Sequence, residues 1–421
     1  MLQSNCGILA GLNYIYQQAN LAGWFMKLPL LIYPIAIPIA LIVLLSGCQS
    51  TAPAMLFPPE QLLVAPQLKG EVTEPETAEQ IFTLPQHTRF ELSRLINSTQ
   101  SMEERTTSVL KLILSYAQDG LLYDNSATKT ASETIAAGRA NCLSLSILAY
   151  SMAKELGMTA VFQDVQIPEY WTSELSQTWL NGHVNLRLQH GRALRGAPGF
   201  VLLAKDIVVD FDPYSLKQQF PEHAISVNRI VAMFYNNKAA VAFASGNDAQ
   251  AYRYYQAAIE IDAYFAPSWS NLGVLYRTNE MHDLAERSYQ QSLTLDPGSI
   301  NTLANLAYLY RQRGEIAKAE PLERRVMLKR RTNPYYHLML GNEAYKGQSY
   351  DTAISHYEKA VALDNKNHEA YFGLARSYYA TQNNQLAASY MLKATRHAPS
   401  AYDQQRYRHK LAVLNQLSSA Y

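Results

Sequence analysis

The chain has 421 residues, enough for two or three domains, and 48% of them are hydrophobic, which permits an ordered core. Its 36 Lys and Arg residues balance 35 Asp and Glu residues, so the net charge of +1 does not indicate a nucleic-acid partner or an acidic substrate. Three cysteines cannot form a disulfide framework.

The N-terminal sequence has the pattern of a targeting signal. Residues 26–48 contain a lysine near the start, a long apolar run and the ending Leu45-Ser46-Gly47-Cys48, which is typical of a secretion signal. The ending resembles the lipobox of bacterial lipoproteins, and the resemblance implies that Cys48 takes a lipid and becomes the mature N-terminus. An uncleaved anchor is the alternative, because a membrane span needs roughly 20 apolar residues. Residues 1–25 contain no Lys or Arg, so we expect a signal peptide over 1–48 with Met26 as the true start.

The next segment, residues 49–79, is rich in proline and lacks periodicity. This composition predicts an extended tether between a membrane and a folded domain. By resemblance, Gln49 after the lipidated cysteine implies sorting to the outer membrane of a Gram-negative cell, facing the periplasm. The expected location is the cell envelope, with the membrane as a partner through the lipid on Cys48.

The C-terminal half is repetitive. From residue 232 the sequence repeats every 34 residues, the period of the tetratricopeptide repeat (TPR). The five copies occupy residues 232–265, 266–299, 300–333, 334–367 and 368–401. In the second copy the signature positions hold Trp269, Leu272, Gly273, Tyr276, Ala285, Tyr289 and Pro297. Because one repeat cannot bury its apolar face alone, five copies predict an all-α solenoid with a capping helix at 402–421.

A TPR array has a concave face that is lined mainly by the first helix of each repeat. Arg, Tyr and Asn side chains there can hold an extended peptide through hydrogen bonds and aromatic contact. The predicted peptide-binding face consists of Asn236, Arg277, Asn301, Tyr308, Arg311, Asn342, Tyr345, Arg376 and Tyr379. The alternative is that these side chains form the solvated side of a scaffold.

Residues 80–231 do not repeat and predict an α+β domain, with helices before strands. The apolar spacing of 142–157 predicts a helix that begins at Cys142. Stretches 158–167, 183–188 and 199–213 predict strands. A cysteine at a helix N-terminus is near unpaired N–H groups and the helix dipole, which stabilise a thiolate or an oxyanion.

A nucleophilic thiol also needs a base and a group that orients the base. His183 enters a predicted strand, and Asp210 and Asp212 end the next one. The two aspartates point to the same face of a strand, so periodicity does not separate them; Asp210 is favoured and Asp212 is the alternative. Asn141, directly before Cys142, is a candidate member of an oxyanion hole. A lone cysteine on an apolar helix is more often a core residue.

The order Cys-His-Asp and the stretches RANCLSLSILAYSMAKELGM, GHVNL and IVVDF resemble the transglutaminase-like superfamily, and more narrowly bacterial lipoproteins that join such a domain to TPRs. The resemblance implies Cys142 as nucleophile, His183 as base and Asp210 as its orienting group. The sequence departs from the superfamily because Val184-Asn185 follows His183 where an aromatic residue is usual. The implied activity is that of a cysteine peptidase or amidase, or of a transamidase. The rival hypothesis is a non-catalytic TPR adaptor with an inactive transglutaminase-like fold.

The sequence carries no pattern typical of a cofactor site. It has no paired cysteines, no His-x-x-x-His on a helix and no phosphate-binding glycine loop, so neither a metal nor a cofactor is expected. The expected partners are a protein or peptide on the TPR face and a membrane, not nucleic acid. The polar, aromatic stretch 166–181 predicts a lid, a substrate wall or a packed surface excursion.

Overall fold

The computed structural model describes residues 54–418 with gaps. The gaps are residues 65, 99–103, 106, 110, 113–121, 125–126, 175–176, 190–193, 196–200, 203–205, 212–219 and 399–400. The predicted signal segment and Cys48 lie outside the described residues, as does Asp212. Among the residues that the structure describes, no helix is long and apolar enough to cross a membrane.

The α+β part is built around one buried helix, α7 (Cys142–Glu155). Asn141 caps α7 by accepting a hydrogen bond from the backbone N–H of Ser144, so the helix begins at Cys142 as predicted. Gly157, in the left-handed region with φ of 67°, follows its C-terminal end. The shorter helices α3 (Ala78–Phe82), α4 (Gln86–Ser98) and α6 (Ala131–Ala137) pack against it. Because α7 is buried on nearly all sides, it is the core helix of this part.

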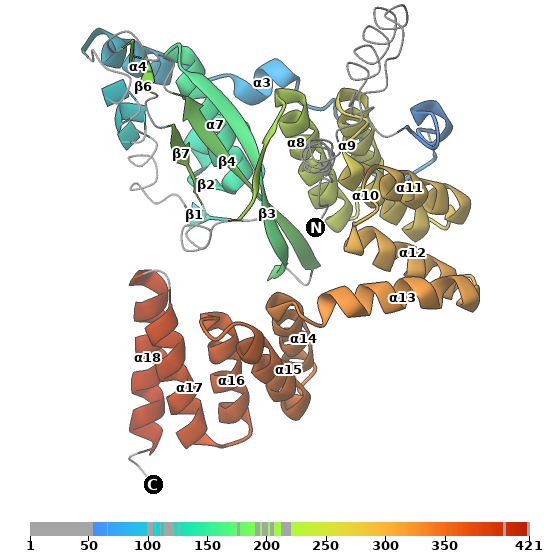
Figure 1. The fold of residues 1–421 in the computed structure, drawn as a ribbon, viewed down its shortest axis with the longest axis vertical. Coiled ribbons are helices and arrows are strands. Elements are labelled where there is room, and N and C mark those ends of the chain that lie inside the picture. Colours follow the sequence, from blue (N-terminus) through green and yellow to red (C-terminus); the bar gives the residue numbers. More distant parts are fainter. Residues whose placement is uncertain are drawn as a thin grey trace, which may run out of the picture. The chain divides into compact units, whose positions relative to one another are not determined.

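An antiparallel sheet covers α7 (Figure 1). Its strand order is β7-β4-β3-β8, formed by β3 (Thr159–Glu174), β4 (Gln177–Gln189), β7 (Ile207–Val209) and β8 (Glu222–Ile225). Phe162, Leu186 and Val209 lie side by side across three strands and are buried, and the Phe162 ring stacks on Tyr150 of α7 at 4.5 Å. Two short pairs complete the strands: β1 (Leu122–Tyr123) with β2 (Arg139–Ala140), and β5 (Leu194–Arg195) with β6 (Val201–Leu202).

Strands β3 and β4 are longer than the sequence predicts. They continue into the stretch expected to be a lid, a substrate wall or a surface excursion and pair antiparallel there. We call residues 169–174 and 177–181 the hairpin arm. Aromatic and β-branched residues such as Tyr170, Trp171 and Thr172 favour extended backbone even among polar neighbours. A register shift between Val165 and Tyr170 separates the arm from the rest of the sheet.

The C-terminal half consists of helix pairs in register with the predicted repeats (Figure 1). The first helix starts at Val227 rather than 232, because Ser226 caps its N-terminus. The helices are α8 (Val227–Ala244), α9 (Asp248–Ile261), α10 (Ala266–Thr278), α11 (His282–Leu295), α12 (Ile300–Gln312), α13 (Ile316–Arg330), α14 (Pro334–Lys346), α15 (Tyr350–Leu363), α16 (His368–Ala380), α17 (Asn384–His397) and the final helix α18 (Ala401–Ser418).

Glycines allow the paired helices to approach closely. A Cβ atom placed on Gly273 would lie 2.6 Å from the ring of Tyr289. A Cβ on Gly341 or on Gly373 would lie 2.5 Å from the ring of Tyr357. The small and large signature residues are therefore complementary in shape, which is why the repeat needs both at fixed spacing.

The array contains two separate hydrophobic cores. The first joins α7, the sheet and the helices α8–α13, which we call the N-terminal repeats. The second belongs to α14–α18, the C-terminal repeats. Between them, α13 buries a single residue, Ala319. Successive repeats pack through α9 on α10, α11 on α12 and α15 on α16, but over the described helices neither α12 nor α13 makes comparable contact with α14.

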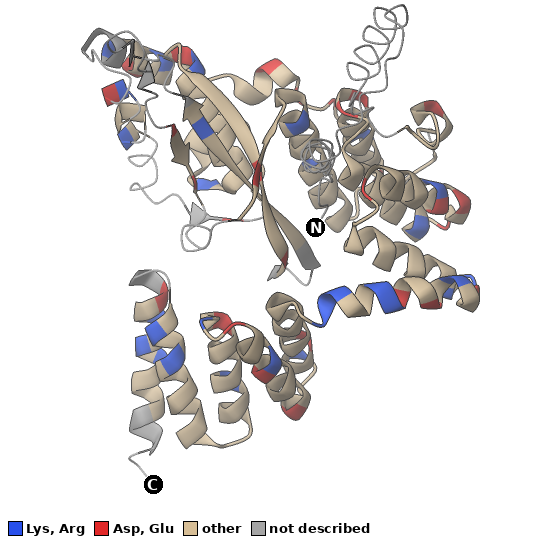
Figure 2. Cartoon of the chain, in the orientation of Figure 1, with Lys and Arg blue, Asp and Glu red and all other residues tan. Residues whose placement is uncertain are grey.

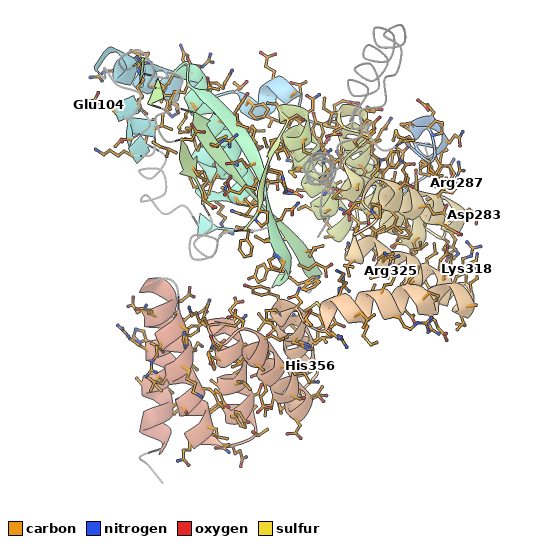
Figure 3. The ribbon with its side chains drawn as sticks, in the orientation of Figure 1. Glu104, Asp283, Arg287, Lys318, Arg325 and His356 are labelled. Atoms are coloured by element: carbon orange, nitrogen blue, oxygen red, sulfur yellow. The ribbon has the colours of Figure 1, made fainter. Side chains whose placement is uncertain are left out.

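The predicted tether is fixed in place where the structure describes it. Residues 54–77, which we call the strap, run along α8–α11. The backbone N–H of Phe57 donates to Gln291 at 2.9 Å, and Leu62 is fully buried. Arg287 of α11 lies over the Phe57 ring at 4.7 Å (Figure 3). Polar side chains of the repeats therefore hold the backbone of these residues, which the sequence alone did not indicate.

Gln250 shows how the strap is held. Its side-chain amide accepts a hydrogen bond from the N–H of Thr73 at 2.6 Å and donates one to the carbonyl of Thr73 at 3.0 Å. The carboxylate of Glu76 lies 2.8 Å from Lys238 and accepts a hydrogen bond from Tyr254. Since these contacts use main-chain atoms and acidic side chains, an extended acidic segment fits this surface well.

Candidate active site and repeat face

Three side chains predicted from the sequence meet at the N-terminus of α7. Nε2 of His183 lies 2.9 and 3.0 Å from the two carboxylate oxygens of Asp210. Sγ of Cys142 lies 4.0 Å from the carbonyl oxygen of Gly182, and its thiol interacts with the imidazole of His183. The structure therefore brings Cys142, His183 and Asp210 together.

Strand pairing explains how the acid reaches the base. Leu186 of β4 pairs with Val209 of β7, and the two strands are antiparallel. Asp210 follows β7 directly, so its side chain comes alongside the part of β4 that carries His183. Antiparallel pairing thus joins two residues that are 27 positions apart in the sequence.

The site is poorly exposed and strongly polarised. The side chains of His183 and Asp210 are 2% and 11% exposed. Burial by itself disfavours the protonated imidazole, but the hydrogen bond to Asp210 and the contact with Cys142 outweigh it and raise the pKa of His183 to about 10.

Asn141 has a structural task at this site. Its Oδ1 accepts from the N–H of Ser144 at 2.9 Å, and its Nδ2 donates to Oγ1 of Thr128 at 2.8 Å. Both ends of the amide thus hold the helix cap. The backbone N–H groups of Cys142 and Leu143, in the first turn of α7, are better placed than the Asn141 side chain to stabilise an oxyanion.

Some side chains of the predicted repeat face bond to other residues of the repeats, and others are accessible to a ligand. Asn236 is buried and accepts a hydrogen bond from Asn271, and Arg311 pairs with Glu323 at 2.6 Å. Arg376 donates to Asn342 and lies over the Tyr345 ring at 4.1 Å. Those side chains stabilise the repeats themselves.

The accessible part of the face centres on α10 and α12. Tyr308 is 54% exposed, and the Arg277 guanidinium lies over its ring at 4.6 Å. Tyr379 is also exposed, on α16, while Asn301 is partly buried. Of the predicted residues, Arg277 and Tyr308 therefore form the best-defined pair that a ligand could reach.

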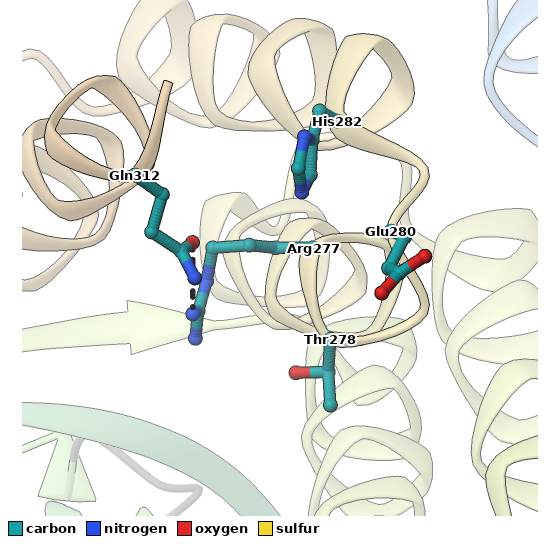
Figure 4. A pocket seen from close by; sticks show the side chains of 5 residues that line it. All are labelled: Arg277, Thr278, Glu280, His282 and Gln312. Carbon is teal, nitrogen blue, oxygen red and sulfur yellow. Dashed lines mark hydrogen bonds between the residues drawn. The ribbon is translucent and has the colours of Figure 1, made fainter. Parts of the chain in front are cut away.

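A cavity of about 630 Å³ opens beside Arg277 (Figure 4). Arg277 also donates to Oε1 of Gln312 at 3.5 Å across it. Sequence reasoning missed four of the lining residues, because the repeat signature specifies buried positions and these lie at helix ends and in a turn. The lining consists of Arg277, Thr278, Glu280, His282 and Gln312. A guanidinium, an imidazole and an amide suit an acidic or amide-bearing peptide side chain.

Comparisons with known proteins address the repeats. Tetratricopeptide repeat models match residues 266–299 and 338–408. The chain is 28% identical over 126 residues to Superkiller protein 3 of Schizosaccharomyces pombe, a match that spans 28% of this chain and 9% of that protein.

Two solved structures are also similar. YrrB, described as a TPR protein with an unusual peptide-binding site, is 18% identical, with 42% of this chain and 92% of that chain covered and a TM-score of 0.24. PilF of Pseudomonas aeruginosa is 20% identical, with 44% and 85% covered and a TM-score of 0.24. Together with the paired helices, the family-model matches define the C-terminal half as an all-α TPR solenoid, a fold of protein–protein interaction.

Proposed function

We propose that the α+β part is a transglutaminase-like domain that catalyses thiol-dependent acyl transfer on protein substrates. One observation carries the proposal. A cysteine at the tip of a buried helix lies near a histidine whose Nε2 is 2.9 Å from an aspartate that directly follows the neighbouring strand. That combination of nucleophile, base and orienting acid is what amide chemistry requires.

The residues divide the reaction between them. His183 first takes the thiol proton and holds it as an imidazolium, in keeping with its raised pKa, and the thiolate Sγ of Cys142 then attacks the carbonyl carbon of a peptide or side-chain amide. The N–H groups at the tip of α7 stabilise the oxyanion. When the C–N bond breaks, His183 gives the proton to the leaving nitrogen, and a thioester remains on Cys142. Asp210 holds the imidazole throughout. Water then attacks the thioester, so the products are a carboxylic acid and the free thiol; an amine acceptor would give transamidation instead.

The other two parts of the proposal concern location and recruitment. The signal-like N-terminal sequence supports a lipid on Cys48 and a place in the cell envelope, at the outer membrane facing the periplasm. The TPR array recruits the protein substrate, and the Arg277–Tyr308 pair beside its cavity is the proposed docking point. Lipid attachment is tested by metabolic labelling with an alkynyl fatty acid, which should be lost in Cys48→Ala.

The second candidate is a non-catalytic TPR adaptor. The burial of the site favours it, because Cys142 is 8% exposed and His183 is 2% exposed. A substrate would have to approach a thiol that presents little surface. In this reading the histidine and aspartate are a buried, stabilising pair, and the repeats perform the function.

Alkylation of the thiol separates the two candidates. The full chain is treated with iodoacetamide, and the Cys142 peptide is quantified by mass spectrometry across pH 5–9. If the site is catalytic, Cys142 should be alkylated fast at pH 6, where an ordinary thiol is protonated. The alkylation rate should fall at least about tenfold in His183→Gln. Ser151→Ala is the control, because Ser151 lies nine residues along α7 from Cys142 and its hydroxyl donates to the carbonyl of Ile147. A folded chain whose Cys142 reacts no faster at pH 6 than in 8 M urea supports the adaptor.

A further inference from the structure

The hairpin arm connects the proposed active site to the C-terminal repeats. Tyr170 of β3 pairs with Asn181 of β4 inside the arm, and Val165 pairs with His183 beyond the register shift. His183 therefore lies two residues beyond the arm on the same strand. Gly182, between them, places its carbonyl oxygen 4.0 Å from Sγ of Cys142. Movement of the arm thus acts on the base and on the surroundings of the nucleophile at once.

An ion pair fixes the arm to the end of α13. The carboxylate of Glu169 accepts two hydrogen bonds from the guanidinium of Arg330, at 3.0 and 3.2 Å. Their side chains are only 20% and 13% exposed. The carbonyl of Glu169 also accepts a hydrogen bond from Asn333 at 2.8 Å. A two-pronged, largely buried ion pair holds its geometry more firmly than an exposed one.

Aromatic rings extend this contact. Tyr170 meets Tyr335 of α14 edge-on, with ring centroids 5.0 Å apart. Trp171 lies 6.0 Å from Tyr336, and the Arg330 guanidinium lies over the Trp171 ring at 5.1 Å. The arm is thus anchored by charge and by edge-on and tilted ring contacts at the junction of α13 and α14.

The arm docks where packing between repeats is interrupted. α14 contacts β3, whereas the described parts of α12 and α13 leave it without the usual neighbour. Met327 and Leu328 of α13 are 60% and 52% exposed. Cationic residues gather along α13 (Figure 2). Its last turn holds Lys329 and Arg330. The arm, through Glu169 and its aromatic rings, therefore contacts α14 where the described parts of α12 and α13 make little contact with it.

We propose that Glu169, held by Arg330, is a positioning residue for His183, so that the C-terminal repeats set the geometry of the active site. The inference rests on the proposed function. A protein bound to α14–α18 shifts the arm through α14, and β4 carries the shift to His183 and to the Gly182 carbonyl. The C-terminal repeats then couple a partner bound to α14–α18 to the reactivity of Cys142, whereas the substrate docks at Arg277 and Tyr308 of the N-terminal repeats.

Removal of the ion pair tests the coupling in the full chain. Arg330→Ala should slow alkylation of Cys142 at pH 6 by about five- to tenfold and displace its pH profile, while circular dichroism shows an unchanged helix content. Arg330→Lys should recover part of the rate. The exchange Glu169→Arg with Arg330→Glu should recover more than either single change. Glu169→Gln provides a second disruption if Arg330→Ala does not fold.

Arg325→Ala is the matched control. Arg325 lies on the same helix (Figure 3), and its one described hydrogen bond goes to the carbonyl of Pro297 at 3.4 Å. It should leave the profile unchanged. If wild type reacts fast at pH 6 and both Arg330→Ala and Glu169→Gln keep its full profile, the coupling is wrong and the proposed function stands. If wild-type Cys142 itself reacts like an unfolded thiol, the proposed function fails and the coupling fails with it.

Discussion

The two groups of repeats share one sequence pattern but differ in what holds them. The N-terminal repeats share a continuous core with α7 and the sheet, and the strap runs across them. The C-terminal repeats have a core of their own and meet the rest of the chain at the arm and at the α13–α14 connection. The repeat pattern fixes the helices, but contacts from outside the pattern decide which repeats unfold together.

The largest expected effect falls on the C-terminal repeats. Tyr357 is fully buried against Gly341 and Gly373, so Tyr357→Ala leaves a cavity and should destabilise these repeats by about 3–5 kcal/mol. Hydrogen exchange should show faster opening of α14–α18 with α8–α11 unchanged. Tyr379→Ala, at an exposed position on α16, should change stability by less than about 0.5 kcal/mol. Equal loss of protection in both groups contradicts the separation into two cores.

The complementary change is in the strap. Leu62 is fully buried in the first core, and Leu62→Ala should destabilise it by about 2–4 kcal/mol. Urea denaturation followed by hydrogen exchange should place the loss in α8–α11 and in α7. Leu56→Ala, a strap position that is 51% exposed, is the control. If the strap merely lay on the surface, Leu62→Ala and Leu56→Ala would lower the stability by equally small amounts.

The smallest expected effect is a pH dependence confined to the C-terminal repeats. Burial, followed by the negative charge of Asp403, raises the pKa of Glu369 to about 7, against the opposing effect of Arg406 and Arg376. The folded form therefore binds the proton of Glu369 more tightly than the unfolded chain does. The contribution of Glu369 to the stability of the C-terminal repeats is full below pH 4.5 and is lost as pH rises through 7. Glu369→Gln should flatten the melting temperature of α14–α18 between pH 4.5 and 8, and Glu343→Gln should not.

Sequence reasoning succeeded where the determining contacts are local. The repeat spacing gives the helix pairs because signature residues such as Gly273 and Tyr289 contact each other within one repeat. Asn141 and Gly157 bound α7 through local hydrogen bonds and backbone geometry, so its start at Cys142 was predictable. The meeting of this cysteine with His183 and Asp210 followed from the order of helix and strands, although the choice against Asp212 stays a prediction.

The strap, the arm and the contacts of the repeat face depend on residues far apart in the sequence, which no local pattern predicts. The strap looks like a linker because its partners lie far along the chain; Thr73 and Gln250 are 177 positions apart. The arm reads as a polar excursion because its aromatic rings pack on α14 rather than on its own sheet. Counting along the repeats predicts the helix face on which Arg376 lies. It does not predict the hydrogen bond from Arg376 to Asn342, because Asn342 belongs to the preceding repeat.

The strap also has a consequence in time. During synthesis, Phe57 joins the chain before its partner Gln291, which lies 234 residues further along the sequence. At about 5–20 residues per second, the strap waits roughly 10–50 s for a surface to bind. The contacts of the strap with α8 and α9 can form earlier, and the one with Gln291 must wait for α11. A nascent chain that stops before α11 therefore holds the later part of the strap but not Phe57.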